Sequence, residues 1–118
     1  MEVEQRFGET VAYKEYEQKT ANYSKSKWQD VSDGLMSVFA KFAECMKGGN
    51  TADSEKAQAL VKELQNYITE NYYTCTKDIL AGLGLMYVTD ERFKNNINKN
   101  GEGTADFVSK AIESYTNN

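Results

Sequence analysis

Few side chains in this chain of 118 residues have the types and spacing that catalysis requires. Histidine is absent, which excludes the common forms of Ser-His and Cys-His catalysis, a proximal histidine for haem and the usual zinc ligand sets. Asp90 and Glu91 could form a pair of catalytic carboxylates, but directly after Thr89 they are better explained as first-turn acids that the helix dipole favours. The sequence therefore predicts a protein that is not an enzyme and that uses no cofactor or metal.

The two cysteines are the remaining side chains with reactive chemistry. Cys45 and Cys75 could pair, but a chain with two cysteines and no export signal is expected to keep them reduced. The charged start of the chain lacks the basic and then apolar order of a signal peptide, and no apolar run is long enough to span a bilayer. We therefore expect a cytoplasmic protein with no membrane partner, in which Cys75 is a small buried hydrophobic residue.

The charge balance bears on the class of partner. The chain has 14 basic and 18 acidic residues, and no block of lysine and arginine offers a surface to phosphate backbones. Nucleic acid is therefore not expected to bind this chain directly.

Aromatic residues are the best supply of binding groups. Aromatic residues at helical spacing usually belong to a core, but eight tyrosines carry more hydroxyl groups than a dry core easily satisfies. Some of them are expected to line a partly wet cavity in which linked aromatic rings would stack. The candidates are Tyr13, Tyr16, Tyr23, Trp28, Tyr72 and Tyr73.

The elements that position these residues are predicted to be helices. The length suits one domain, and the absence of proline favours uninterrupted helices joined by glycine and polar turns. The spacing of apolar residues predicts where these helices lie. The first runs from Trp28 to Met46 and ends before Gly48-Gly49. The second follows Ser54 and carries a stripe of Ala57, Val61, Leu64 and Ile68. The third runs from Cys75 to Met86, a short fourth follows Thr89, and the last carries Val108, Ile112 and Tyr115.

The third of these helices has the widest apolar surface. Cys75, Ile79, Gly82 and Met86 lie along one side of it, and further apolar residues widen the arc, which predicts the central and most buried helix. Gly82 and Gly84 each cost about 1 kcal/mol relative to alanine in a helix. Either they let a neighbouring helix pack closely, or Gly82 forms the floor of a ligand pocket.

The first 34 residues differ in composition from the rest, because all ten leucines and isoleucines of the chain lie from Leu35 onward. Ordering a backbone residue costs about 1 to 2 kcal/mol, whereas burying one large apolar side chain returns roughly 1.5 to 3 kcal/mol. A segment so poor in aliphatic residues is expected to be marginally folded. On composition alone it would be a pair of surface helices with amphipathic tyrosines.

The run from Tyr72 to Phe93 closely resembles the signature of the TipAS-type antibiotic-recognition domain. Further motifs recur at the spacing of that family, so the resemblance covers nearly the whole chain. They are Glu2-Val3-Glu4, Ala12-Tyr13-Lys14, Lys19-Thr20, Tyr23, Trp28, Ala52-Asp53-Ser54 and Gly101-Glu102-Gly103. The resemblance implies an all-α, globin-like ligand-binding domain over residues 1–118. In full-length relatives this domain follows the DNA-binding head of a MerR-type activator and recognises thiopeptides or other multi-ring drugs.

The resemblance also implies how a ligand would bind. Residues 1–27 would order as a lid over a helical core formed by residues 28–118. A cysteine that traps dehydroamino acids in some relatives falls at Gly82 here, which implies reversible binding, and the altered Asn71-Tyr72-Tyr73-Thr74-Cys75 pattern leaves the ligand itself open. The expected ligand-binding residues are Tyr13, Tyr16, Tyr23, Trp28, Phe39, Tyr72, Tyr73, Cys75, Ile79, Gly82 and Met86.

Two functions are therefore expected, in order of preference. The first is the binding of bulky, ring-rich antibiotics or hydrophobic drugs, either as the sensor of a MerR-type activator or as a stand-alone protein that sequesters the drug. The alternative is a helical protein-interaction module without a small-molecule ligand, in which exposed aromatic residues contact a protein partner.

Overall fold

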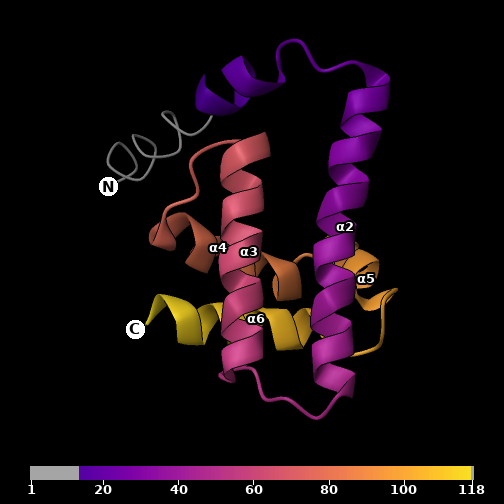
Figure 1. Cartoon of the computed structure of the whole chain (residues 1–118), viewed down its shortest axis with the longest axis vertical. Helices are drawn as coiled ribbons and strands as arrows, with labels where there is room; N and C mark the ends of the chain where they lie inside the picture. The colour runs from indigo at the N-terminus through magenta and orange to yellow at the C-terminus, as the bar shows by residue number, and fades with distance from the viewer. Residues whose placement is uncertain (1–13, 118) are drawn as a thin grey trace.

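A computed structural model describes residues 14–117 of the chain. All regular structure in this range is helical, which confirms the predicted all-α class. A helical stretch over residues 14–20 precedes the longer elements. These are α2 (Lys25–Lys47), α3 (Glu55–Asn71), α4 (Lys77–Thr89), α5 (Glu91–Asn98) and α6 (Thr104–Thr116). In Figure 1, α2 and α3 stand side by side, α6 lies across their lower part, and the 14–20 stretch lies above the upper end of α3.

Side-chain caps fix where most of these helices begin. Ser24, Ser54 and Thr76 each accept a hydrogen bond from a backbone N–H in the first turn of the helix that follows, which satisfies a donor that has no partner within the helix. The predicted start of the short helix at Thr89 is wrong by one residue. Thr89 ends α4, and the carboxylate of Asp90 caps α5 by accepting from the backbone N–H of Arg92 at 3.0 Å.

Gly48 and Gly49, which were predicted to end the helix from Trp28 to Met46, lie at the end of α2. Gly48 is the C-cap of α2, and its N–H donates to the carbonyl of Glu44 at 2.9 Å. Gly49 has a φ of +86°, a left-handed conformation that glycine adopts without steric cost. The chain can therefore turn sharply between α2 and α3.

The core lies where α2, α3 and α6 meet. The stripe predicted on α3 is the buried one, and it faces Val38 and Phe42 of α2 and residues of α6 in a single cluster. Fully buried members of this core include Phe42, Val61, Leu64, Leu80, Val108 and Ile112. Each such aliphatic or aromatic side chain contributes roughly 1.5 to 3 kcal/mol by leaving water.

The prediction that α4 is the most buried helix is wrong. It buries Leu80, Gly84 and Tyr87, whereas α6, also of 13 residues, buries six. Leu85 of α4 is 64% exposed. The helix packs on α6 and α5, but Ile79, Leu83 and Met86 stay only half-buried, so its apolar arc is wider than the surface it uses for packing.

The two glycines of α4 have separate roles. A Cβ added at Gly84 would lie 3.0 Å from Cγ2 of Ile112 on α6, whereas one added at Gly82 would meet no atom within 4 Å. Gly84 is therefore the glycine that permits close helix packing. Gly82 is exposed, and packing does not explain it.

Candidate functional site

We call residues 14–24, which precede α2, the leading segment. Four aromatic side chains gather where this segment meets the end of α3. We call Tyr16, Tyr23, Trp28 and Tyr72 the aromatic cluster. The ring centroid of Trp28 lies 6.1 Å from that of Tyr16, 5.2 Å from Tyr23 and 6.4 Å from Tyr72. Tyr16 and Tyr72 are nearly parallel, with their centroids 6.3 Å apart and an angle of 7° between the rings. Each ring is half-buried, so the cluster keeps aromatic surface available.

The hydroxyls of Tyr72, in the cluster, and of Tyr73, next to it in the chain, stay protonated over the usual pH range. Burial raises the pKa of Tyr72 to about 12, and the nearby hydroxyls of Tyr67, Tyr16 and Tyr23 add to the shift. Burial also raises the pKa of Tyr73 to about 12, with a smaller effect of Cys75. These hydroxyls are therefore neutral groups that can donate hydrogen bonds.

The leading segment is tied to the end of α3 by polar contacts. The carboxylate of Glu15 accepts from the backbone N–H of Thr74 at 3.0 Å and also from its hydroxyl. The ammonium of Lys19 donates to the carbonyl of Thr69, and the hydroxyl of Tyr23 donates to the carbonyl of Asn71 at 2.7 Å. The hydrogen bonds to Glu15 hold its pKa below the ordinary value, with a smaller contribution from Lys19.

The thiol of Cys75 is not poised for reaction. The residue is 3% exposed, its backbone N–H donates to the hydroxyl of Thr69 at 3.0 Å, and burial raises its pKa to about 11. The thiolate, which is the nucleophile, is therefore scarce near neutral pH. Both Cys75 and Cys45 are free and buried in the structure.

The structure brings together some of the predicted ligand-binding residues and separates others. Tyr13 lies outside the described residues, as do residues 1–13 of the predicted lid. Tyr73, Ile79 and Met86 are half-buried against the core cluster. Phe39 is a core residue, 3% exposed, and its ring meets that of Tyr87 edge-on at 5.4 Å between centroids. Gly82 is exposed on α4.

Sequence reasoning missed the polar residues that hold the cluster in place. Lys19 binds a backbone carbonyl, and Asn71 offers its own backbone carbonyl. Glu15 binds the backbone N–H as well as the hydroxyl of Thr74. Contacts to backbone atoms leave no pattern of residue types. The sequence did contain one signal for the position of Tyr67, which is the glycine Gly34 within α2. A Cβ at Gly34 would overlap the Tyr67 hydroxyl, which donates to the carbonyl of Val31 at 2.6 Å.

Asp90 and Glu91 show no arrangement suited to catalysis. The Asp90 carboxylate caps α5 and forms an ion pair with Arg92 at 3.2 Å. The hydrogen bonds from Arg92 lower the pKa of this carboxyl group. Among residues 14–117, no group of three or more His, Cys, Asp or Glu side chains could hold a metal ion.

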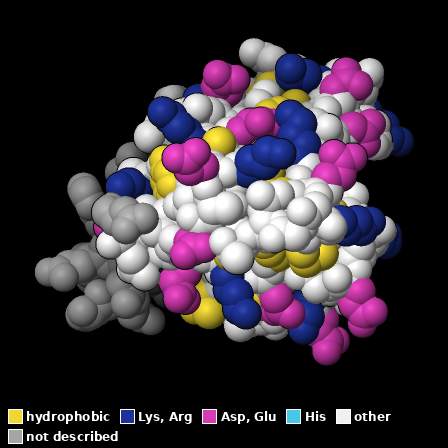
Figure 2. Space-filling model, turned by 60° about the horizontal axis from the view of Figure 1, so that its bottom comes forward, with side chains coloured by type: hydrophobic (Ala, Val, Ile, Leu, Met, Phe, Trp, Pro, Cys, Tyr) yellow, Lys and Arg dark blue, Asp and Glu magenta, His cyan; other side chains and the backbone are white. Residues whose placement is uncertain are grey.

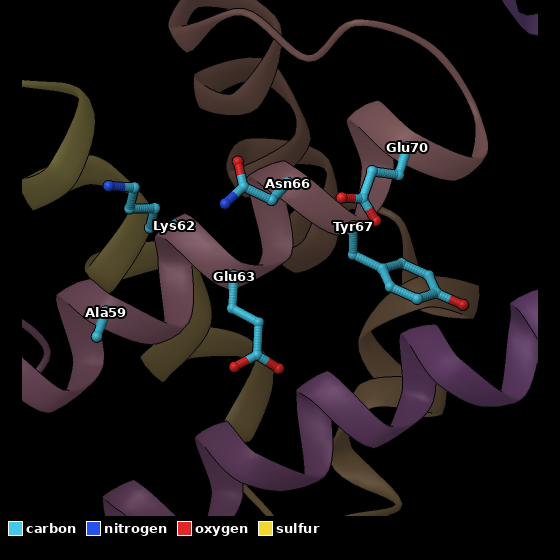
Figure 3. A pocket seen from close by; sticks show the side chains of 6 residues that line it. All are labelled: Ala59, Lys62, Glu63, Asn66, Tyr67 and Glu70. Atoms are coloured by element: carbon cyan, nitrogen blue, oxygen red, sulfur yellow. The ribbon is translucent and has the colours of Figure 1, made fainter.

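A surface pocket of about 350 Å³ lies along α3, lined by Ala59, Lys62, Glu63, Asn66, Tyr67 and Glu70. Figure 3 shows the side chains of Tyr67 and Glu63 reaching towards α2, while those of Lys62, Asn66 and Glu70 project from other parts of α3. Glu63 forms an ion pair with Lys41 of α2 at 2.7 Å. The pocket offers one aromatic ring among charged groups, so it is the solvated face of α3 rather than a site for a ring-rich ligand.

The surface has no strongly basic area on the face that Figure 2 shows, where lysine and arginine side chains alternate with acidic ones. Such an alternation gives no continuous attraction for a phosphate backbone. In the part of the chain that the structure describes, no helix has both the length and the apolar character needed to cross a bilayer.

Known proteins resemble this chain over most of its length. The family model for the TipAS antibiotic-recognition domain matches residues 1–115. The HTH-type transcriptional activator TipA of Streptomyces coelicolor is 38% identical over 111 residues, which make up 94% of this chain and 44% of that protein. The HTH-type transcriptional activator mta of Bacillus subtilis is 39% identical over 114 residues, 97% of this chain and 43% of that protein. The chain thus spans less than half the length of these curated relatives.

A solved structure agrees with the sequence comparison. TipAS of Streptomyces lividans, in complex with nosiheptide, matches with a TM-score of 0.81 and 36% identity over 98% of this chain and 80% of that one. That structure is described as part of a thiopeptide antibiotic multidrug resistance system. At this identity and coverage, the likeness extends to the arrangement of all the described helices.

Proposed function

Because the chain belongs to the TipAS antibiotic-recognition domain family, we propose that it binds bulky, ring-rich antibiotics of the thiopeptide kind, or hydrophobic drugs, at the aromatic cluster. The observation that carries this proposal is that Tyr16, Tyr23, Trp28 and Tyr72 gather as half-buried rings outside the aliphatic core. Stacking of one aromatic ring on another contributes about 0.5 to 1.5 kcal/mol beyond the burial of area. A ligand with several linked rings can collect this contribution more than once.

The exposed side of α4 supports a second part of the same site. Ile79 and Met86 are half-buried, and between them Gly82 has open space above it. A ligand that covered this side would remove apolar surface from water that the fold itself leaves exposed, at roughly 25 cal/mol per Å². The proposed site therefore joins the aromatic cluster to Ile79, Gly82 and Met86, with Tyr73 beside them.

Binding is proposed to be reversible and without catalysis. No thiol stands at Gly82, and Cys75 is too buried and its pKa too high for it to add to an electrophilic alkene. The predicted lid, residues 1–27, is proposed to order over the ligand because it contains no leucine or isoleucine. The side chains of Glu15, Lys19 and Tyr23 attach the described part of this segment to the core. Amide exchange in this segment should slow on binding; equal protection with and without ligand would contradict the closure.

The cellular role is proposed from the relatives. Two of them are named as HTH-type transcriptional activators, so a DNA-binding head joined to this domain would report the drug to transcription. Without such a head the domain would sequester the drug in the cytoplasm. The mixed surface charge supports the proposal that these residues do not themselves bind DNA.

Calorimetry with nosiheptide tests the proposed function. Trp28→Ala removes the ring at the centre of the cluster and should weaken binding at least about tenfold, since truncating a central aromatic residue commonly costs more than 1.4 kcal/mol. Tyr115→Ala is the matched control, because Tyr115 is a half-buried ring on α6 whose partners are Gln65 and Lys77. Equal affinity in both variants, or no binding by the wild-type protein to a panel of thiopeptides, would overturn the proposal.

A second candidate function is a helical protein-interaction module. It is supported by the exposed large side chains Leu85 and Phe93, which are 64% and 39% accessible. If ring-rich drugs fail to raise the melting temperature, which any ligand of the native state must do, while Leu85→Ser abolishes capture of a protein partner, this function replaces the first.

A further inference from the structure

The carboxyl end of α3 has the features of a site for a positively charged group. The last carbonyl groups of a helix have no partner within the helix and carry the negative end of its dipole. Helix α3 has no basic residue in its last turn. The carbonyl of Ile68 accepts from the backbone of Tyr72, but those of Thr69 and Asn71 accept from side chains of the leading segment. The end of α3 is thus completed by groups from another part of the chain.

One of those groups is an ammonium. Lys19 donates to the carbonyl of Thr69 and is close enough to Glu15 to lower the pKa of that carboxyl. Tyr16, one turn before Lys19, is stacked with Tyr72 just beyond the last residue of α3. The ammonium therefore lies at a carbonyl of the helix end and near a carboxylate, both of which favour a cation.

We propose that the carboxyl end of α3 is a cation subsite of the ligand site, and that Lys19 occupies it as a tethered cation. The ligand class that the subsite accepts is an aromatic compound with a protonated amine, whose ammonium takes the place of the Lys19 ammonium while its rings contact the aromatic cluster. The inference rests on the proposed function to the extent that it adds a charge preference to the same site. Neutral ring-rich ligands leave Lys19 in place.

The test uses Lys19→Met, which vacates the subsite and keeps the length and helix propensity of the side chain. The probes are phenethylamine, which is protonated at neutral pH, and phenethyl alcohol, its neutral counterpart. Trp28 is the only tryptophan of the chain, so its fluorescence reports binding at the cluster. Lys19→Met should bind phenethylamine at least about tenfold more tightly than the wild-type protein, which corresponds to about 1.4 kcal/mol, and salt should reduce the gain.

Two control variants separate the subsite from simpler explanations. Lys27→Met removes one positive charge from the same neighbourhood, where the ammonium lies 5.5 Å from the ring of Tyr23, but vacates no helix carbonyl, so it should not produce the gain. Lys19→Arg keeps a cation in the subsite and should behave as the wild type. A similar gain for phenethyl alcohol would mean that the leading segment had only loosened, and would overturn the subsite, as would no gain for phenethylamine.

The outcome is independent of antibiotic binding. If nosiheptide fails to bind but Lys19→Met gains affinity for the amine alone, the subsite stands and the proposed antibiotic ligand does not. If nosiheptide binds at the cluster but the amine shows no gain in Lys19→Met, the proposed function stands and the cation subsite is wrong.

Discussion

The aliphatic core and the aromatic cluster are held together by different forces. In the core, Val61, Leu64 and Ile112 are at most 1% exposed, and burial of apolar area is what stabilises their arrangement. In the aromatic cluster every ring stays half-buried, and hydrogen bonds from Lys19 and Tyr23 to backbone carbonyls attach the leading segment. We therefore expect the core to fold without the cluster, and the cluster to depend on the core for its place.

This difference in burial separates the residues that stabilise the fold from those that can still bind a ligand. A half-buried ring has not yet gained the full free energy of burial, so a ligand can still supply it. A fully buried leucine has nothing left to gain from a ligand. Substitutions in the two regions should accordingly act on different quantities, the free energy of unfolding for the core and the affinity or local opening for the cluster.

The largest expected effect comes from Leu64→Ala. Leu64 is fully buried on α3, and truncating such a leucine costs about 2 to 5 kcal/mol of unfolding free energy through lost burial and a cavity. Leu85→Ala is the matched control, because Leu85 is 64% exposed and its loss should change stability by no more than about 0.5 kcal/mol. Urea unfolding measures both. Equal costs would mean that burial does not distinguish these two leucines.

A smaller effect is expected from Gly84→Val. The new side chain would begin 3.0 Å from Ile112 and should cost about 1 to 3 kcal/mol by forcing α4 away from α6. Gly82→Ala has open space instead and should stabilise the protein by up to about 1 kcal/mol through helix propensity. Thermal unfolding gives the sign of each change, and a destabilised Gly82→Ala would show that this glycine also packs.

Tyr23→Phe tests whether the leading segment opens independently of the core. The variant keeps the ring against Trp28 but loses the hydrogen bond to the Asn71 carbonyl, which is worth about 0.5 to 1.5 kcal/mol. Amide exchange of segment 14–23 should become faster while the urea midpoint of the core stays the same. A midpoint that falls along with the protection of the segment would mean that the two regions unfold together.

The smallest effect is expected from acidification. Since hydrogen bonds from Thr74 lower the pKa of Glu15 below its ordinary value of 4.5, the Glu15 contact is complete above pH 4.5 and is lost as pH falls through the lowered pKa. The protection factor of the Thr74 N–H, which is the intrinsic exchange rate divided by the observed rate at the same pH, should fall in acid in the wild-type protein. Glu15→Gln should show no such dependence, and an identical fall in that variant would assign the change to another group.

The sequence was sufficient to predict the helices and much of the core. The stripe on α3 and the caps at Ser54 and Gly48 depend on local spacing and on residue types with strong preferences, which a single sequence displays directly. The burial of α4 could not be predicted in the same way. Periodicity reports which residues are apolar but not how much of that surface another helix covers, so the helix that was expected to be the most buried leaves Leu85 64% exposed.

The candidate site was predictable in its aromatic residues and not in its attachments. Tyr16, Tyr23, Trp28 and Tyr72 stood out by residue type, and the structure brings them together. Phe39 was also placed in the expected set, but its helical spacing equally fitted the core, where it lies. The roles of Lys19 and Glu15 depend on contacts between segments about fifty residues apart, and no local pattern encodes such distant pairs.

The contacts of Lys19 and Tyr23 with the end of α3 have a consequence for how the family diverges. Both side chains bind main-chain carbonyl oxygens, those of Thr69 and Asn71, and every amino acid supplies such an oxygen. Mutations that change the side chains of residues 69–71 therefore leave the acceptors of the leading segment in place. We therefore expect that side chains in the last turn of α3 can vary among related chains while the leading segment keeps its attachment.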